Sequence, residues 1–411
     1  MTVPPAWIYA QLGAIANVQM GQSPDSNTYN AAKQGLPFFQ GKAEFGKYSP
    51  TARKWCTSPS KVAEPGNILL SIRAPVGPLN VADVRCAIGR GLAAIAPLAG
   101  VNGSYLVHAL RHLEPQLASK ATGTTFPAVG GEVVRALDVP LAPAREQKRI
   151  ADKLDTVLTR VDAVNTRLAR VAPILKRFRQ SVLAAATSGR LTERWRISHQ
   201  LPAPRPTILG DMIKVSSGDG LTAKEMNSDG GIPVYGGNGV NGFHNEANVF
   251  EPTIVIGRVG YYCGSVHLTP SPAWVTDNAL RVKFDQAVFD RSFLYYALLG
   301  TDLRSNMSST AQPVISGQKI YPIGINIPSA AEQSEIVRRV ETLFAFADRL
   351  EARLQTAQTA TERLTPALLA KAFRGELVPQ DSNDEPANEL LRRLRQEAPS
   401  ASAKRGRKSA A

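Results

Sequence analysis

The stretch that decides the fold is residues 147–191, QKRIADKLDTVLTRVDAVNTRLARVAPILKRFRQSVLAAATSGRL. Its apolar residues recur at alternating steps of four and three, at Ile150, Leu154, Val157, Val161, Val164, Leu168, Val171, Leu175, Phe178 and Val182. A heptad pattern sustained in this way is typical of a helix that pairs with another helix along one apolar seam. We therefore predict a helical segment over residues 145–190.

A second copy of this stretch follows at residues 333–377 without a gap, and we predict a second helical segment over residues 331–378. Its seam keeps the same register, at Ile336, Val340, Leu343, Ala347, Leu350, Leu354, Ala357, Thr361, Leu364 and Leu368. Two such seams in one chain can cover each other, so we expect the two segments to pair as an antiparallel coiled coil. The pattern alone leaves open whether the partner helix lies inside the chain.

Two kinds of residue predict where these helices are interrupted. Pro173 and Pro366 each remove a backbone hydrogen bond and crowd the preceding turn, so we expect a kink or a break at both. Gly189 and Gly375 are suited to end the helices.

The two regions before the helical segments, residues 1–144 and 205–330, have a different composition. They are rich in Gly, Pro, Asn and Ser between short apolar runs, which predicts short strands at residues 67–72, 91–95, 253–256 and 279–282. Helices are expected near residues 105–113 and 291–299. Weaker matches between the regions, such as Leu12-Gly13 with Leu209-Gly210, extend the internal repeat upstream. We predict two mixed α/β modules with compact β-rich cores, related by a pseudo-twofold repeat, with residues 191–204 as a linker.

The composition fits folded domains with a polyanionic partner. The chain has 411 residues, 43% hydrophobic and 20% charged, with a formal net charge of +14. This excess of Lys and Arg favours nucleic-acid phosphates, although ribosomal, RNA-binding and membrane-surface proteins show the same balance. We find neither an apolar run of about 18 residues nor a signal peptide, and expect a cytoplasmic protein without a membrane partner.

Catalytic and metal-binding signatures are incomplete or missing. The GxGxxG match at residues 237–242 does not open a helix, so we interpret it as a loop. The GxxxxGK match at residues 41–47 is followed by Tyr48, where a phosphate loop needs Ser or Thr. The Asn/Asp-Pro-Pro-aromatic motif of amino-methyltransferases is not found, and the three cysteines and five histidines are scattered. We therefore expect no catalytic site, no metal site and no cofactor in this chain.

Polar and basic residues in the predicted loops are candidates for DNA contact, because Arg and Lys suit guanine, Asn and Gln suit adenine, and hydroxyls suit phosphates. In the first module the candidates are Lys42, Lys47, Arg53, Arg73, Arg90, Lys120, Thr122 and Thr124. In the second module they are Lys224, Asn238, Arg258, Arg281, Thr310 and Lys319. For each residue taken alone, a solvated surface or a turn is the favoured explanation. Arg73 and Arg258 are the strongest pair, because each follows a strand-like run in a glycine-bearing turn at matching positions of the repeat.

Several of these stretches resemble the HsdS family, the specificity subunits of Type I restriction enzymes. The resemblance rests on residues 145–155 and their second copy at residues 332–341, on the helix ending at residues 175–191, and on IPVYGGNG at residues 232–239. It covers nearly the whole chain.

The resemblance implies that each module is a target-recognition domain for one half of a split double-stranded DNA site. The paired helices would set the gap and dock two modification subunits, and restriction subunits would complete the complex. S-adenosylmethionine, ATP and Mg are expected on those partners, so this chain would not be an enzyme. A helix from Glu146 to Ala172 spans roughly 40 Å, which is close to the roughly 34–36 Å between successive major grooves on one face of DNA.

Two other functions remain open from the residues, a single-chain DNA-modifying enzyme and a coiled-coil interaction scaffold without a DNA role. Residues 379–411 end in the basic run Lys404–Lys408 and are expected to form a basic, flexible tail.

Overall fold

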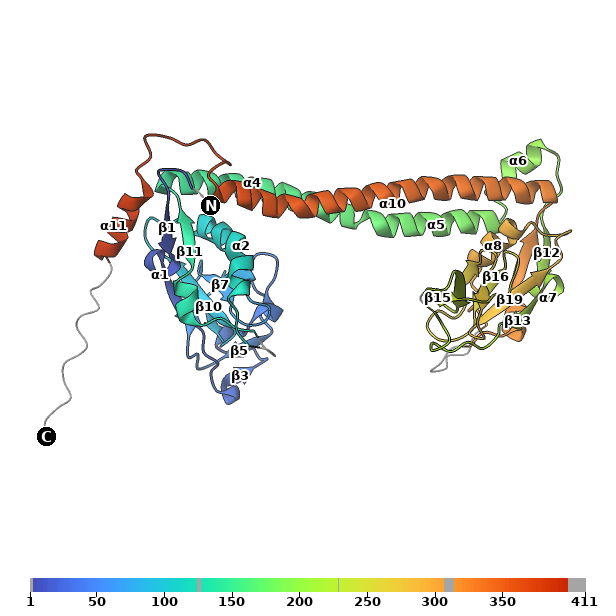
Figure 1. Cartoon of the computed structure of the whole chain (residues 1–411), viewed down its shortest axis with the longest axis horizontal. Coiled ribbons are helices and arrows are strands. Elements are labelled where there is room, and N and C mark those ends of the chain that lie inside the picture. The colour runs from blue at the N-terminus through green and yellow to red at the C-terminus, as the bar shows by residue number, and fades with distance from the viewer. Residues whose placement is uncertain (1–2, 124–126, 228, 307–313, 398–411) are drawn as a thin grey trace. The chain divides into compact units, whose positions relative to one another are not determined.

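The computed structural model divides the chain into two compact units. Unit 1 comprises Met1–Arg167 and Gln358–Ala411, and unit 2 comprises Leu168–Ala357. The structure describes residues 3–123, 127–227, 229–306 and 314–397. Each unit therefore contains one module and part of the helical segments (Figure 1).

Unit 1 is built on two sheets and a strand pair. A four-stranded antiparallel sheet has the order β2-β10-β7-β8, a five-stranded sheet has the order β3-β5-β4-β9-β6, and β1 pairs with β11. The strands are β1 Ile8–Gln11, β2 Ala16–Met20, β3 Tyr29–Asn30, β4 Leu36–Phe39, β5 Lys54–Cys56, β6 Val62–Ala63, β7 Ile68–Ser71, β8 Leu79–Val81, β9 Cys86–Ile88, β10 Leu92–Pro97 and β11 Asp138–Leu141. Its module helices are α1 Leu12–Ile15, α2 Gly103–Ser119 and α3 Gly131–Arg135, with two 3-10 turns, η1 Ser26–Thr28 and η2 Lys42–Glu44.

Unit 2 repeats this plan with a smaller second sheet. Its sheets have the orders β13-β19-β16-β17 and β15-β14-β18, and β12 pairs with β20. The strands are β12 Arg205–Ile208, β13 Ile213–Ser217, β14 Ile232–Gly236, β15 Gly239–His244, β16 Ile254–Gly257, β17 Val266–Leu268, β18 Trp274–Val275, β19 Ala279–Phe284 and β20 Gly324–Ile327. Its module helices are α6 Glu193–Ser198, α7 Leu209–Met212, α8 Arg291–Leu299 and α9 Gly317–Ile320. The predicted mixed α/β modules and their internal repeat are confirmed.

The GxGxxG match lies in a β-hairpin. Gly239 begins strand β15, which pairs antiparallel with β14 across a turn that contains Asn238. The glycine adopts φ +87°, the left-handed region that favours glycine in such turns. The interpretation as a loop rather than a strand-to-helix fingerprint is therefore confirmed.

The first helical segment is interrupted at Arg170, shortly before Pro173, where the break was expected. Helix α4 runs over Ala144–Ala169 and helix α5 over Val171–Thr187, with Arg170 between them. Pro173 lies in the first turn of α5, where its missing N–H group leaves no hydrogen bond unmade. Gly189 follows the helix at φ +73° and ends it as predicted.

The second segment has no such interruption. Helix α10 runs over Ala330–Phe373 and passes through Pro366, so, of the kink or break expected at this proline, the break is wrong. Beyond the proline, Leu369 and Phe373 are buried in the core of unit 1, and this burial offsets the lost hydrogen bond. The helix ends before Gly375, which adopts φ +76° as expected.

The apolar seams contribute to both cores. In unit 1, Ile150 and Leu154 of α4 share one cluster with Leu369 and Phe373 of α10. In unit 2, Val182 and Leu183 of α5 share a cluster with Ile336 and Val340 of α10, together with the half-buried Leu343.

Polar contacts give the direction of the helix pair in unit 2. Arg179 in the middle of α5 pairs with Asp348 (2.6 Å) and Glu351 (2.9 Å) of α10. Leu191, just beyond the end of α5, accepts a hydrogen bond from Arg339 (2.6 Å), nearer the start of α10. The two helices therefore run antiparallel within unit 2.

Not every predicted seam residue is covered. Leu354 and Val161 are buried, and Val157, Leu168 and Leu350 are half-buried. Val164 and Leu364, by contrast, are 41% and 44% exposed, so the structure does not cover the predicted seam at these two positions. A straight helix turns once in 3.6 residues, and heptad positions drift away from the partner by about 20° in each repeat.

The chain beyond α10 differs from the flexible tail that was expected. Helix α11 (Ala387–Glu397) buries Leu390, Leu391 and Leu394 in the core of unit 1. The amide of Ala387 donates to the carbonyl of Ala6 at 2.9 Å. The apolar face of α11 explains the difference, because it removes more apolar surface from water than a solvated tail would. Residues 398–411, with the basic run, lie outside the described residues.

Candidate nucleic-acid interface

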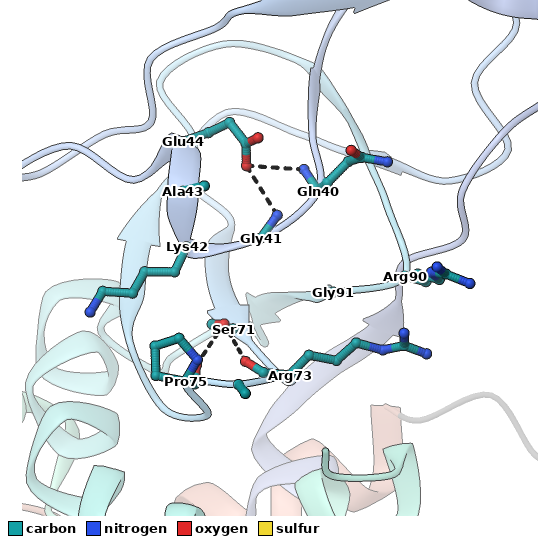
Figure 2. Close-up of a pocket in the computed structure, with 11 residues that line it drawn as sticks. Gln40, Gly41, Lys42, Ala43, Glu44, Ser71, Arg73, Pro75, Arg90 and Gly91 are labelled. Carbon is teal, nitrogen blue, oxygen red and sulfur yellow. Dashed lines mark hydrogen bonds between the residues drawn. The ribbon is translucent and has the colours of Figure 1, made fainter. Parts of the chain in front are cut away.

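Unit 1 has a cationic pocket at the end of strand β7. The pocket has a volume of about 680 Å³ and is lined by Gln40, Gly41, Lys42, Ala43, Glu44, Ser71, Arg73, Ala74, Pro75, Arg90 and Gly91. Three of the predicted contact residues, Lys42, Arg73 and Arg90, therefore lie around one hollow, and all three are exposed. Figure 2 shows the Arg73 and Arg90 side chains pointing in the same direction, while Lys42 points the other way.

The acidic residue of this pocket, Glu44, is bonded to backbone amides and not to the three basic side chains. The Glu44 carboxylate accepts hydrogen bonds from the backbone amides of Gly41 (3.1 Å) and Gln40 (3.3 Å). It thus shapes the loop that carries Gln40 and Lys42 (Figure 2). The pocket can therefore offer two guanidinium groups and a carboxamide to phosphates or to base edges.

The loop that carries Arg73 is held firmly. We call residues 72–78, between β7 and β8, hairpin loop 1. The Ser71 hydroxyl donates to the carbonyls of Arg73 (3.1 Å) and Pro75 (2.9 Å), and the amide of Gly77 donates to the Ser71 carbonyl (2.9 Å). The backbone beneath Arg73 is therefore fixed while its side chain remains exposed.

The other candidates of the first module do not line this pocket. Lys47 pairs with Asp162 of α4 at 3.1 Å, and the hydrogen bond from this carboxylate raises the pKa of Lys47. Arg53 is exposed just before β5, Lys120 caps the end of α2, and Thr122 is exposed and forms a backbone bridge with Ala128. Thr124 lies outside the described residues.

Unit 2 has an equivalent loop, residues 258–265 between β16 and β17, which we call hairpin loop 2. In loop 1 the bond from Gly77 to Ser71 closes the hairpin, and in loop 2 the amide of Gly264 donates to the Gly257 carbonyl at 2.8 Å. The strand pairs on either side also correspond, since β7 lies between β10 and β8 as β16 lies between β19 and β17.

The register of these loops corrects the pairing of Arg73 with Arg258. The amide of Ile72 donates to the carbonyl of the residue just before β10 (3.0 Å). The amide of Arg258 donates to the carbonyl of the residue just before β19 (2.9 Å). Arg258 is therefore equivalent to the buried Ile72, and Val259 is equivalent to Arg73. The two arginines match in the aligned sequences, whereas the backbone hydrogen bonds set a register that differs by one residue.

The guanidinium groups of Arg258 and Arg281 are bonded inside unit 2. Arg258 donates to the Ser217 hydroxyl (3.2 Å) and to the Asp277 carbonyl (3.4 Å). Arg281 donates to the Ser217 carbonyl (2.8 Å) and pairs with Asp219 (3.3 Å). Both side chains hold the end of β13 to neighbouring strands and turns.

The remaining candidates of the second module are spread over several elements. Lys224 and Asn238 are exposed, Asn238 at the tip of the β14–β15 hairpin. Lys319 is half-buried and donates to the Val314 carbonyl at 2.8 Å. Thr310 lies outside the described residues.

Each copy of the helical repeat begins with a Glu-Gln pair, Glu146-Gln147 and Glu332-Gln333, whose role the sequence did not reveal. The buried Gln147 accepts from the amide of Asn102, the N-cap of α2 (2.9 Å), and donates to the Ala142 carbonyl (2.8 Å). The buried Gln333 likewise accepts from the amide of Asp290, the N-cap of α8 (2.8 Å), and donates to the Val288 carbonyl (2.8 Å). Each glutamine thus fixes its module helix to the start of a long helix, and their repetition at equal spacing was the signal.

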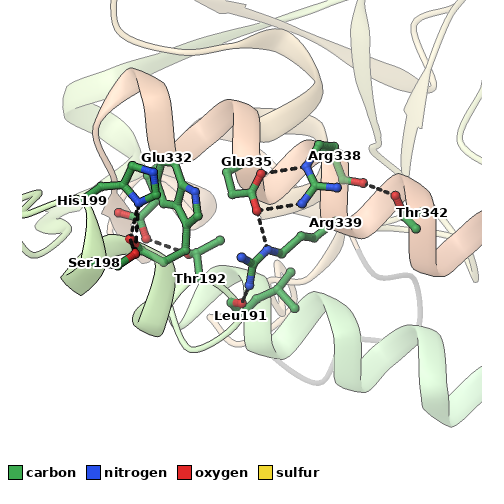
Figure 3. A network of polar contacts seen from close by, with 10 residues as sticks. Leu191, Thr192, Ser198, His199, Glu332, Glu335, Arg338, Arg339 and Thr342 are labelled. Atoms are coloured by element: carbon green, nitrogen blue, oxygen red, sulfur yellow. Dashed lines mark hydrogen bonds and ion pairs between the residues drawn. The ribbon is translucent and has the colours of Figure 1, made fainter.

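The glutamates of the two pairs have different partners. Glu146 accepts from the Trp7 indole N–H (2.9 Å) and from the Gln380 amide (2.5 Å), and burial raises its pKa. Glu332 accepts from the Thr192 hydroxyl and pairs with Arg196, both at 2.7 Å. Figure 3 shows Glu332 beside Thr192 near the start of α10. The first carboxylate is held by neutral groups, and the second is held partly by a cation.

Among the described residues, no helix is long and apolar enough to cross a bilayer, and no group of three or more His, Cys, Asp or Glu side chains is placed to hold a metal ion.

Comparison with known proteins identifies similar chains over most of the sequence. Residues 4–172 and 207–358 match the model of the Type I restriction modification DNA specificity domain. The chain is 32% identical over 327 residues to the Type I restriction enzyme StySPI specificity subunit of Salmonella potsdam, covering 72% of this chain and 70% of that protein. It is 28% identical over 415 residues to the EcoDI specificity subunit of Escherichia coli, covering 92% and 90%.

Solved structures are similar over part or most of the chain. The HsdS subunit of Thermoanaerobacter tengcongensis is 44% identical, with 41% of each chain covered and a TM-score of 0.38. The Type I restriction-modification S subunit of M. genitalium is 18% identical, with 93% of this chain and 99% of that chain covered and a TM-score of 0.46. From the two matched domains and the curated relatives, we conclude that this chain belongs to the Type I restriction-modification DNA specificity family, the family of the specificity subunits.

Proposed function

We propose that this chain reads a bipartite double-stranded DNA target, one half-site with each module, and takes no catalytic part itself. The observation that carries the proposal is the equivalence of hairpin loops 1 and 2. The same backbone hydrogen bonds hold both loops, but different side chains project from them. A duplicated scaffold with different loop chemistry is suited to reading two different half-sites.

The charge of the chain supports DNA as the partner. The net charge of +14 attracts phosphates over the whole protein, while the pocket of Arg73 and Arg90 concentrates guanidinium groups at one place. Arginine is the side chain best suited to pair with guanine in the major groove. Lys42 and the other exposed basic residues would position the protein on the backbone without reading sequence.

The helical segments are proposed to serve the rest of the complex. Helices α4, α5 and α10 would set the gap between the half-sites and dock two modification subunits, which hold S-adenosylmethionine, with restriction subunits and their ATP and Mg beyond them. The internal repeat supports two equivalent docking places, because each repeat presents the same helix ends. All of these partners act on DNA in the cytoplasm.

Methylome sequencing tests this function. The chain would be produced with its modification subunits in a methylation-free host, and the modified adenines would be mapped by long-read sequencing. The expected result is one split motif that requires both proteins, while the purified chain alone transfers no methyl group. Removing one heptad from α4 and one from the facing part of α10 should shorten the unread gap. An unsplit motif, or methylation without this chain, would reject the proposal.

A further inference from the structure

Hairpin loop 2 presents a pair of tyrosines to solvent. Tyr261 is 84% exposed and Tyr262 is 46% exposed, and their rings meet edge-on with centroids 5.1 Å apart. An aromatic side chain so far from the core contributes little to packing, and exposed tyrosines of this kind are typical of contact surfaces.

The backbone beneath Tyr261 is fixed. Gly260 and Gly264 turn the chain with φ of +77° and +84°. The Arg304 guanidinium donates to the carbonyl of Tyr261 (2.9 Å) and to that of the buried Cys263 (2.5 Å). The loop therefore holds the ring outward without having to order itself on binding, which lowers the entropy cost of a contact.

Loop 2 also occupies the place that loop 1 occupies in unit 1. There, the equivalent loop lines the cationic pocket and presents Arg73. In loop 2, Val259 stands at the Arg73 position, and the guanidinium of Arg258 is bonded to Ser217 and Asp277. The most exposed large hydrophobic side chain that loop 2 offers is therefore the ring of Tyr261.

We infer that Tyr261 contacts the C5-methyl group of a thymine in the second half-site. This inference rests on the proposed function and names one specificity-determining residue within it. Thymine is the base that presents an apolar group in the major groove, and apolar side chains read it by contact with that methyl group. Loop 1 would then read its half-site through a guanidinium group, whereas loop 2 would read its own through an aromatic ring.

The test replaces thymine by uracil, which lacks only this methyl group. Binding of the complex of this chain with its modification subunits would be measured on duplexes that carry its motif, with each thymine of the second half-site changed singly. For the native complex, one uracil should weaken binding about fourfold, as expected for one methyl group removed from an apolar contact. Tyr261→Ala should weaken binding to the thymine duplex roughly tenfold and abolish the difference between thymine and uracil.

Two variants serve as controls. Tyr261→Phe keeps the ring and should retain both the affinity and the preference for thymine. Phe250→Ala removes another exposed aromatic side chain, 75% exposed and located before β16 rather than after it, and should change neither.

The outcomes separate this contact from the proposed function. A native complex that methylates no split motif would refute the function and the contact together. A split motif whose second half lacks A·T pairs, or whose uracil duplexes bind equally to the native complex, would refute the contact alone. Loss of binding in Tyr261→Ala with the preference for thymine unchanged would also refute it.

Discussion

The two modules share a backbone and differ in what they present from it. The strand order of the four-stranded sheets, the loop closures and the helix caps correspond, yet Arg73 of loop 1 is replaced by Val259 in loop 2. The turn before β10 carries Arg90, and the equivalent turn before β19 carries Asp277, although the same backbone bond of 3.0 Å closes both turns. The comparison teaches that the hydrogen-bonded frame is conserved between the modules while the charge of its surface is not.

The same contrast extends to how each module is joined to the helices. In unit 1, helix α11 packs on the core, and the Glu146 carboxylate of α4 accepts hydrogen bonds from neutral groups. In unit 2, the Glu332 carboxylate of α10 forms an ion pair with Arg196. The two units should therefore respond differently to equivalent changes.

The largest difference should follow from removing α11. Deletion of residues 381–411 takes four buried side chains, among them Leu390 and Leu394, out of the core of unit 1, and leaves Arg149 without Asp384. We expect unit 1 to lose about 4 kcal/mol or more of its free energy of unfolding, and unit 2 to lose none. Hydrogen exchange measured by mass spectrometry reports the two units separately. Deletion of residues 398–411 is the control, and equal loss of protection in both units would contradict the expectation.

Removing the buried carboxylates should come next. Glu332→Ala leaves the Arg196 side chain, which is 14% exposed, without its ion-pair partner, and should cost unit 2 about 3–5 kcal/mol. Glu146→Ala leaves only neutral donors unpaired and should cost unit 1 about 1–3 kcal/mol. Denaturant unfolding followed by hydrogen exchange measures both changes. The matched variants Glu332→Gln and Glu146→Gln should be milder, and a larger loss in unit 1 than in unit 2 would break the comparison.

Substitution of the two loop arginines should affect DNA reading differently. Arg73→Ala removes an exposed guanidinium and should weaken recognition of the first half-site by about 1–3 kcal/mol. Arg258→Ala removes bonds inside unit 2, so it should loosen loop 2 and weaken reading of the second half-site less, by about 0.5–1.5 kcal/mol. Methylation of motif variants by the whole complex measures each effect. Unchanged motifs in both variants would exclude these residues as contributors.

Acidification should give the smallest difference. Hydrogen bonds from Arg338 and from Arg339 lower the pKa of Glu335 in unit 2 to about 2. Since this value lies below that of the unfolded chain, the stabilisation is complete above about pH 4.5 and is lost as the pH falls towards 2. We expect up to about 1 kcal/mol. Burial raises the pKa of Glu146 in unit 1, so protonation of that group stabilises the folded form instead.

Measuring unfolding of the native protein and of Glu335→Gln across this pH range checks the expectation. The variant should lack the contribution of unit 2, and identical pH profiles for the two proteins would show that Glu335 does not cause it.

The sequence was most informative where local structure follows from the spacing of apolar residues or from the geometry of a glycine. The heptad seams, the strands at residues 67–72 and 279–282, and the stop at Gly189 could be predicted because apolar spacing and glycine geometry act locally. A short helix at residues 388–396 was indicated by the sequence, but the packing of α11 on unit 1 was not, because the many polar residues around Leu390, Leu391 and Leu394 suggested a solvated tail. The continuity of α10 through Pro366 depends on core packing far away in the sequence.

The candidate site was predicted in part for the same reason. Lys42, Arg73 and Arg90 are brought together by three separate loops, and composition identified each loop without showing that they meet. Arg258 was matched to Arg73 instead of Ile72, because the register of a hairpin is set by strand pairing and not by the identity of its residues. The exposure of Tyr261 depends on Arg304, which lies about 40 residues away in the chain.

The buried side chains of Gln147 and Gln333 also determine which modules can be attached to the long helices. Each accepts from the amide of a helix N-cap residue and donates to a carbonyl just after a strand, that of Ala142 after β11 or of Pro328 after β20. A foreign module that supplies those few backbone groups could be exchanged into either position by recombination, whatever its surface residues are. The two module positions therefore have equivalent attachment contacts, and a module can change while its contacts with the long helix stay the same.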